Sequence, residues 1–243
     1  MKIIDVNMSI GHKDHNGKIV TTESLLALME DYRIDHAVCY HAHTWLDPKD
    51  GNTKMAQIAK DSAGKIGLCL MLDPTLGADS LPGEGSLQER IAAMQPECLR
   101  VFPKMGRVPF HPFYWEEILD AANVLGLPII IDEPYRPEFF FILPDMSRQY
   151  PNVKFILIEQ GCCENRRIFP LAQKCTNVYF TCERMLDNQQ IEELEARGCS
   201  DKLLFGSGYP NRPHAGALGL VLYANIQAEN REKIFCKNWE AMV

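Results

Sequence analysis

The sequence predicts an α/β fold, a single (β/α)8 TIM barrel with eight parallel strands. Eight short apolar segments alternate with segments of helical periodicity along the chain. The apolar runs 129–131 and 155–158 lack polar alternation, as is typical of strands covered on both faces. The chain has 243 residues, the usual length of one such barrel. Since no linker, repeat or low-complexity tract divides it, residues 1–243 are predicted to form one domain.

The predicted strands are apolar runs that stop at turn-forming or charged residues. Asp73 and Pro74 close the third run, and Pro103 stops the fourth. Gly206 and Gly208 permit a tight turn or a close backbone approach after the last run. The strands are predicted at residues 2–6, 37–41, 66–72, 98–102, 127–131, 153–158, 177–181 and 202–205.

The predicted helices begin at capping residues and carry apolar residues at helical spacing. Thr21 or Thr22 can cap the first helix, in which Leu25, Leu28 and Met29 recur on one face. Helices are predicted over residues 22–33, 52–62, 86–94, 111–124, 139–149, 164–174, 188–197, 215–228 and 231–239.

The composition excludes several classes of partner. The chain is 46% hydrophobic and 23% charged, as in ordinary soluble globular proteins. Its net charge of −7 argues against nucleic acid, because phosphate binding needs a basic patch. No apolar run approaches the length of a membrane span. We therefore expect a small-molecule substrate or ligand, no nucleic-acid or membrane partner, and a possible homodimer formed through the outer helices.

The nine cysteines form no metal-binding pattern. In particular, the sequence contains no Cys-x-x-Cys motif. The odd number of cysteines and the absence of an export signal favour a reducing, cytoplasmic location. The adjacent pair Cys162 and Cys163 is interpreted as a structural pair at a helix start.

Polar side chains follow the predicted strands, where the active site of such a barrel is built. Asp132 and Glu159 end consecutive strands, and neighbouring strands lie about 5 Å apart. A close pair of acids leaves one carboxyl protonated near neutral pH and gives an acid and a base together. Alternatively, the two acids cap the following helices or pair with Arg100. The strand-end groups are Asn7, Ser9, His41, His43, Asp73, Arg100, Asp132, Glu133, Glu159, Gln160, Cys182, Glu183, Ser207 and Gly208.

His41 and His43 lie on the same side of the second predicted strand, because residues i and i+2 share a face. Two imidazoles with a nearby carboxylate could hold a metal ion. The alternative that we favour is a substrate-facing or surface pair without metal.

A set of short segments spread along the chain is characteristic in its order and spacing: residues 3–6 (IIDV), 51–52 (GN), 72–74 (LDP), 99–103 (LRVFP), 125–128 (LGLP), 150–155 (YPNVKF), 177–179 (NVY), 203–210 (LLFGSGYP) and 238 (N). Together these segments resemble the amidohydrolase-related proteins of the amidohydrolase superfamily, a branch with metal-dependent hydrolases and decarboxylases. The resemblance covers nearly the whole chain and implies a metal-dependent hydrolase-like barrel.

The resemblance also implies five metal-ligand positions, and this chain differs at all of them. The family's His-x-His corresponds to Asn7 and Ser9, its next two histidines to Asp132 and Glu159, and its aspartate to Gly208. Asn, Ser, Asp, Glu and Gly make a poor zinc site, so we expect no metal and no cofactor. Asp132 and Glu159 with Asn7 could alternatively hold magnesium through oxygen.

Three functions follow as hypotheses. The first is an amidohydrolase-like hydrolase, or a lyase of the decarboxylase type, that acts without the family metal on a small polar carbonyl compound. Its predicted catalytic residues are Asp132 and Glu159. The second is a metal-dependent hydrolase whose ligands have moved to the histidines at 41 and 43. The third is an inactive barrel that binds a small molecule or a protein. The predicted substrate-binding residues are Asn7, Ser9, His41, His43, Arg100 and Gly208.

Overall fold

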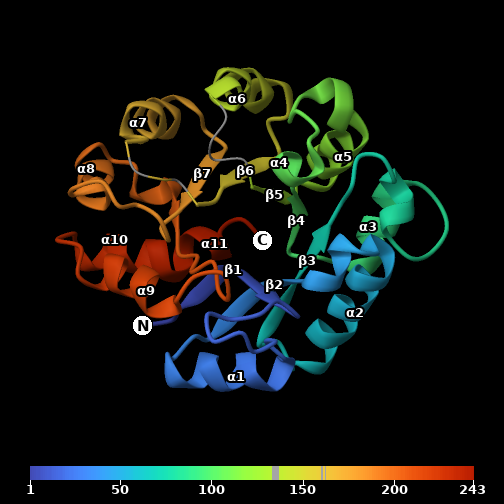
Figure 1. The fold of residues 1–243 in the computed structure, drawn as a ribbon. Coiled ribbons are helices and arrows are strands. Elements are labelled where there is room, and N and C mark those ends of the chain that lie inside the picture. The colour runs from blue at the N-terminus through green and yellow to red at the C-terminus, as the bar shows by residue number, and fades with distance from the viewer. Residues whose placement is uncertain (133–136, 160, 162) are drawn as a thin grey trace.

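The predicted barrel is confirmed by a computed structural model, which describes residues 1–132, 137–159, 161 and 163–243. Eight parallel strands form one sheet in the order β1 to β8, so each strand pairs with its neighbours in sequence. Figure 1 shows most of the helices as an outer ring around these strands. The predicted strand-end residues Glu133 and Gln160, and Cys162 of the cysteine pair, lie outside the described residues.

The elements alternate along the chain as the apolar pattern predicts. The strands are β1 (Ile4–Ile10), β2 (His36–His41), β3 (Ile66–Met71), β4 (Cys98–Val101), β5 (Pro128–Ile131), β6 (Lys154–Leu157), β7 (Val178–Thr181) and β8 (Leu203–Leu204). The α-helices are α1 (Thr22–Asp31), α2 (Pro48–Asp61), α3 (Leu87–Met94), α4 (Pro103–Gly106), α5 (Pro112–Leu125), α6 (Pro137–Gln149), α7 (Asn165–Lys174), α8 (Gln190–Ala196), α9 (His214–Leu222), α10 (Ala228–Glu232) and α11 (Asn238–Glu240). Short 3₁₀ or π segments are η1 (Ala42–Trp45), η2 (Gly77–Ser80), η3 (Ser200–Lys202) and η4 (Lys233–Lys237).

The barrel closes between β1 and the segment that follows β8. The backbone N–H of Val6 donates to the Phe205 carbonyl at 3.0 Å, and that of Gly208 donates to the Asn7 carbonyl at 2.9 Å. Inside this seam, the carboxylate of Asp5 accepts hydrogen bonds from the backbone N–H groups of Asn7 and Ser207, both at 3.0 Å. The chain therefore brings its first strand and the 203–210 stretch together at one site.

Two apolar cores account for the strands' uniform hydrophobicity. Side chains such as Ile130 and Ile156 fill the barrel interior, whereas Ile129 and Ile131 pack with the surrounding helices. Because successive side chains on a strand point to opposite faces, an isoleucine run serves both cores at once. The predicted burial of Ile130 and Ile156 is confirmed, since neither is exposed.

β1 is longer than predicted and contains an irregularity that decides where its polar residues point. The pairing with β2 places one extra residue in β1 between Asp5 and Met8. Before it, Ile4 and Val6 belong to the interior core; after it, Met8 packs with the outer core. A bulge of this kind re-aims side chains next to active sites. The sequence had predicted that Asn7 and Ser9 follow the strand. In the structure they lie within it.

The second helix also begins earlier than predicted. It starts at Pro48 instead of residue 52, and the side chain of Asp47 accepts a hydrogen bond from the N–H of Asp50 at 3.0 Å. Asp followed by Pro is a helix-start signal that the sequence prediction overlooked.

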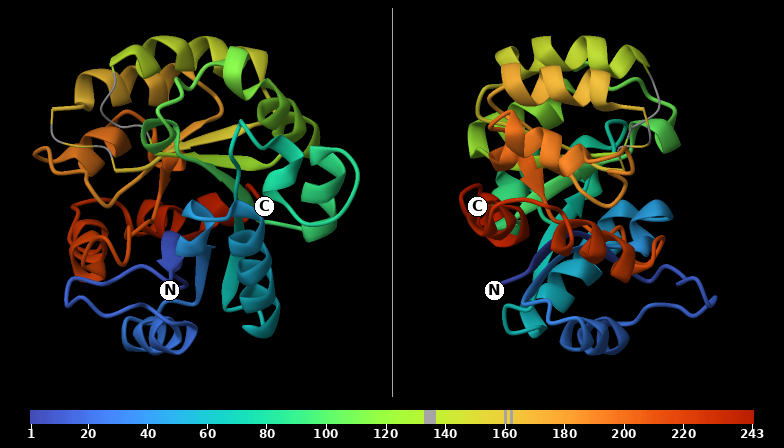
Figure 2. Two further views of the ribbon diagram at one scale, coloured as in Figure 1. Left: turned by 45° about the vertical axis from the view of Figure 1, so that its right-hand side comes forward. Right: turned by 90° about the vertical axis from the view of Figure 1, so that its left-hand side faces the viewer.

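Both chain ends lie at the end of the barrel where the strands begin. In the right-hand view of Figure 2 the N and C labels are on the same side, while the loop after β1 extends on the opposite side. Trp239 of α11 reaches the interior core from this end. Among the described helices, none combines the length and the apolar character needed to cross a membrane.

Candidate active site

A pocket opens at the carboxyl ends of the strands, where barrels of this type carry their active sites. Its volume is about 270 Å³. Every predicted site residue except His41 and His43 lines it. These lining residues are Asn7, Ser9, Arg100, Asp132, Glu159 and Gly208.

The guanidinium of Arg100 lies at the centre of this pocket. Arg100 comes from β4 and is only 4% exposed. Its Nη1 donates to Asn7 Oδ1 at 2.8 Å, and its Cζ lies 4.5 Å from the centroid of the Tyr40 ring and 4.8 Å from that of Phe102. The centroids of these two rings lie 5.4 Å apart, so both rings flank the cation from one side and attract it through cation–π interaction. Within the described chain its Nε has no hydrogen-bond partner, so the cation keeps capacity for a further acceptor.

A chain of hydrogen bonds continues from Arg100 behind the pocket wall. The Nδ2 of Asn7 donates to Glu183 Oε1 at 3.0 Å, and the backbone N–H of Glu159 donates to the same oxygen at 2.9 Å. The side chain of Glu159 accepts from Arg212 Nη2 at 3.3 Å. Glu159 has a φ of +55°, a left-handed conformation that is unusual for a side-chain-bearing residue and is frequent at functional sites.

Asp132 follows β5, and its surroundings shift its pKa. Burial raises the pKa of Asp132; Arg100 lowers it, and the charge of Glu159 raises it further. The sequence had predicted a raised pKa from repulsion between Asp132 and Glu159. The direction agrees, but removal from water is the larger cause.

His41 and His43 lie away from the pocket. The backbone N–H of His43 donates to His41 Nδ1 at 3.0 Å, and His43 Nε2 lies 2.9 Å from Asp50 Oδ2 at the start of α2. His41 therefore caps η1, and His43 pairs with a partly buried helix residue. Among the residues that the structure describes, no group of three or more His, Cys, Asp or Glu side chains is arranged to hold a metal ion.

Sequence reasoning missed the aromatic side of the pocket. Tyr40, Trp45 and His12 line it together with the predicted polar residues. The Tyr40 hydroxyl oxygen lies 3.3 Å from His12 Nε2. Burial raises the pKa of the Tyr40 hydroxyl and lowers the pKa of His12. Tyr40 directly precedes His41 near the end of a largely apolar strand. This position near the strand end is the feature of the sequence that could have identified it as a pocket residue.

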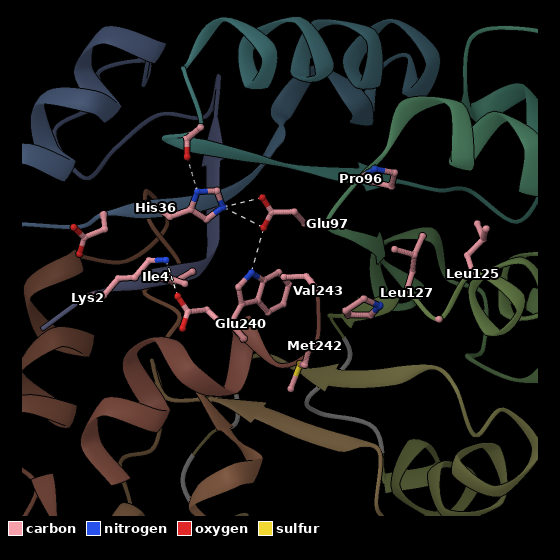
Figure 3. A pocket seen from close by; sticks show the side chains of 15 residues that line it. Lys2, Ile4, His36, Pro96, Glu97, Leu125, Leu127, Glu240, Met242 and Val243 are labelled. Atoms are coloured by element: carbon pink, nitrogen blue, oxygen red, sulfur yellow. Dashed lines mark hydrogen bonds and ion pairs between the residues drawn. The ribbon is translucent and has the colours of Figure 1, made fainter. Parts of the chain in front are cut away.

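A larger cavity of about 680 Å³ lies at the opposite end of the barrel. Figure 3 shows that its polar side chains face one another. Lys2 pairs with Glu240, and Glu97 accepts from the ring nitrogens of His36 and Trp239 at 2.8 and 3.2 Å. These polar groups form hydrogen bonds and ion pairs with one another. The cavity lies at the end where the strands begin, and residues at that end of such barrels contribute to stability rather than to catalysis. The smaller pocket around Arg100 is therefore the candidate active site.

Comparison with known proteins agrees with this architecture. A family model described as Amidohydrolase matches residues 24–242. No curated protein matches the chain.

Solved structures share the fold at low sequence identity. An uncharacterised TIM-barrel protein from Bordetella bronchiseptica is 16% identical, with a TM-score of 0.77 over 100% of this chain and 98% of that one. A 2,6-dihydroxybenzoate decarboxylase from Rhizobium is 12% identical, with a TM-score of 0.75 over 100% and 98% of the two chains. A dihydroxybenzoic acid decarboxylase from a Polaromonas species, with bound manganese and the inhibitor 2-nitroresorcinol, is 12% identical, with a TM-score of 0.74 over 99% and 96%.

Proposed function

This chain belongs to the amidohydrolase family, and from that premise we propose that it is an enzyme in which Arg100 takes the place of the family's metal ion. Its substrate is a small polar compound that carries a carbonyl or carboxylate group. The reaction is a hydrolysis, or a lyase reaction of the decarboxylase type, with Asp132 and Glu159 as the proton-transferring groups.

The donor set around Arg100 supports a site without metal. The oxygen of Asn7, at one of the positions implied for a metal ligand, already accepts a hydrogen bond from the guanidinium. A divalent ion beside this buried cation would experience strong repulsion. Gly208, at the position implied for the acidic ligand, supplies no side chain, and the neighbouring space faces Arg212 and Glu183. These residues do not fit a transition-metal ion.

Arg100 is suited to receive the anionic oxygen of a substrate. Arginine binds carboxylates through several parallel N–H groups and keeps its charge at all physiological pH values. A buried N–H with no partner within the described residues costs free energy unless an acceptor binds it. The charged side chain of Arg100 in the pocket wall is the observation that carries the proposal.

Asp132 supplies the proton transfer. Its raised pKa keeps a larger fraction of the carboxyl protonated near neutral pH than for an ordinary aspartate. In hydrolysis, the ionised form takes a proton from the attacking water and returns it to the leaving group. In the lyase reaction, the protonated form gives its proton to the carbon that releases carbon dioxide. Glu159, held by Arg212, lies on the same pocket wall and serves as the second carboxylate.

The test is the binding and turnover of small carboxylates. Benzoate and 2,6-dihydroxybenzoate are suitable probes, because the decarboxylases with the same fold act on such compounds. Calorimetry should show binding to the wild-type protein and a loss of about 10- to 100-fold in Arg100→Met, the range for losing a charge-assisted hydrogen bond. Arg197→Met, on the exposed end of α8, removes the same charge outside the pocket and should bind as wild type does.

Turnover distinguishes an enzyme from a binding protein. Asp132→Asn should abolish conversion of an accepted substrate while it preserves binding. If probes bind through Arg100 but no carbonyl or carboxylate compound is converted, the protein is a binding barrel rather than an enzyme. If Arg100→Met binds the probes as tightly as wild type, the proposed role of Arg100 is wrong.

A further inference from the structure

Glu183 is a buried carboxyl group that lies behind the pocket wall. It follows β7 and is 6% exposed. It does not belong to the pocket lining, so a substrate would not contact it. Nevertheless, its carboxylate accepts hydrogen bonds from two pocket residues, Asn7 and Glu159.

The contact with Asn7 determines which end of that amide faces the pocket. An ionised carboxylate only accepts hydrogen bonds, so Asn7 must present its NH₂ group to Glu183. The amide oxygen then points the other way, where it accepts from Arg100 Nη1 at 2.8 Å. With the amide reversed, its NH₂ would face the guanidinium, donor against donor. Glu183 therefore holds the acceptor that positions Arg100.

The contact with Glu159 acts on the part of the pocket that follows β6. The N–H of Glu159 donates to Glu183 Oε1 at 2.9 Å, in a residue whose φ of +55° is costly for a side chain. One carboxylate oxygen thus restrains the first strand and the turn after β6 together. The other oxygen, Oε2, has no partner within the described chain.

From these contacts we propose that Glu183 is a positioning residue, which orients Asn7 and Glu159 around Arg100 and tunes the affinity of the site for an anion through its own charge. The inference rests on the proposed function, because it assigns Glu183 to the same anion-binding site.

The charges around Glu183 determine how it responds to pH. Burial raises the pKa of Glu183 to about 7; hydrogen bonds from Thr181 and from the backbone lower it, and the charge of Glu159 raises it. Glu159 is itself paired with Arg212, and the buried thiol of Cys182 also lies within the field of Glu183. Because Oε2 is unpartnered, a proton can bind there while Oε1 continues to accept both hydrogen bonds. Protonation therefore removes charge and preserves the geometry.

The direction of the effect follows from like-charge repulsion. As the pH rises through about 7, Glu183 ionises and adds a negative charge behind Asn7. A carboxylate bound at Arg100 should then bind less tightly, by roughly threefold to tenfold for one added charge in a partly screened site. Burial lowers the pKa of His12, which moves its titration away from that of Glu183.

The experiment measures the dissociation constant of benzoate between about pH 6 and about pH 8.5, the window of a group that titrates near neutrality. Wild-type affinity should fall as the pH rises. Glu183→Gln keeps an acceptor oxygen for Asn7 and Glu159 but cannot ionise, so its affinity should stay near the low-pH wild-type value throughout. Glu183→Leu removes the acceptor and should bind benzoate weakly at every pH.

Two results would overturn the proposal: a Glu183→Gln variant with the same pH dependence as wild type, or a folded Glu183→Leu variant that binds like wild type. Thermal melting shows whether each variant is folded. If Glu183→Leu does not fold, the pH dependence of benzoate affinity in Glu183→Gln alone tests the proposal.

Failure of the proposed function would appear differently, as a wild-type protein that binds no carboxylate at any pH. In that case the side-chain ¹⁵N–¹H signals of Asn7 still test the positioning role. They should shift with pH around neutrality in wild type and not in Glu183→Gln. Signals that are insensitive to pH in both proteins would contradict it.

Discussion

Arg100 and Asp132 illustrate how the pocket works at the scale of single residues. The buried guanidinium stabilises the ionised form of a carboxyl that burial otherwise drives toward protonation. The two effects oppose each other, and burial is the larger one. The acid therefore keeps a raised pKa although a cation lies near it, which is the condition for proton transfer near neutral pH.

Replacing Arg100 by an uncharged residue should show how far the guanidinium lowers the pKa of Asp132. In Arg100→Met the pKa of Asp132 should rise above its wild-type value, because burial and the repulsion from Glu159 are then opposed only by the weaker attraction of Lys104. Carbon-detected NMR titration of the aspartate carboxyl measures this directly. An Asp132 pKa that stays constant or falls in the variant would show that the guanidinium does not act on this acid.

Asp132 should also reduce stability at neutral pH. Its pKa is raised in the folded state, so the ionised form is less favourable there than in the unfolded chain. This cost is complete above the folded pKa and disappears as the pH falls below the unfolded value of about 3.9. Asp132→Asn should therefore be more stable than wild type at neutral pH, with a gain that shrinks on acidification.

Denaturant titrations of Asp132→Asn at neutral and acidic pH provide this measurement. Glu84→Gln, which neutralises an exposed loop carboxyl, serves as the matched control. A gain in stability that is the same at both pH values, or one that Glu84→Gln reproduces, would mean that the gain does not come from ionisation of Asp132.

At the scale of elements, the bulge in β1 and the seam with β8 bring the site together. The extra residue between Asp5 and Met8 turns Asn7 and Ser9 toward the pocket. The N–H of Gly208 pairs with the Asn7 carbonyl across the seam. Residues far apart in the sequence, Asn7 in β1 and Gly208 after β8, thus become neighbours through a backbone hydrogen bond.

The strands that carry the acids depend on close packing within the barrel. Ile130 and Ile156 pair across β5 and β6 and are fully buried in the interior core. Truncating either to Ala should cost roughly 2–5 kcal/mol of unfolding free energy, from lost burial and the cavity left behind. A denaturant titration measures this cost, and a loss below about 1 kcal/mol would contradict the interior assignment.

The opposite end of the barrel holds a pH-dependent contact between β2 and the loop before β4. Burial lowers the pKa of His36, but the hydrogen bond and charge of Glu97 outweigh it, so the net pKa is raised. The contact contributes its full stability below the unfolded histidine pKa of about 6.5 and loses it as the pH rises through the folded value.

Melting temperatures of wild type and His36→Gln should therefore differ most in mild acid and converge in mild alkali. His15→Gln, in the exposed loop after β1, is the control that removes a histidine without this partner. A difference that grows as the pH rises would have the wrong sign for a protonated His36 paired with Glu97.

At the scale of the whole molecule, the barrel could be predicted from the sequence because strand and helix periodicities are local properties. The isoleucine runs indicate strands, and Gly126 indicates the end of a helix, without reference to any other part of the chain. The end of β1 could not be predicted, since the polar residues Asn7 and Ser9 interrupt the apolar pattern there although they lie inside the strand.

The candidate site was predictable only in part for the same reason. Strand-end position identified Arg100, Asp132 and Glu159 as neighbours. It could not show that His43 instead pairs with Asp50, because the direction of the loop after β2 depends on tertiary contacts. Nor could it assign a role to Glu183, whose importance comes from hydrogen bonds to residues far away in the sequence.

The central claim is that a guanidinium, rather than a metal ion, is the cation of this barrel. The most direct test is the affinity of the purified protein for benzoate before and after removal of metal ions with a chelator. The account predicts an unchanged dissociation constant after chelation and a large loss of affinity in Arg100→Met. Binding that disappears on chelation and returns with added manganese or zinc would contradict it.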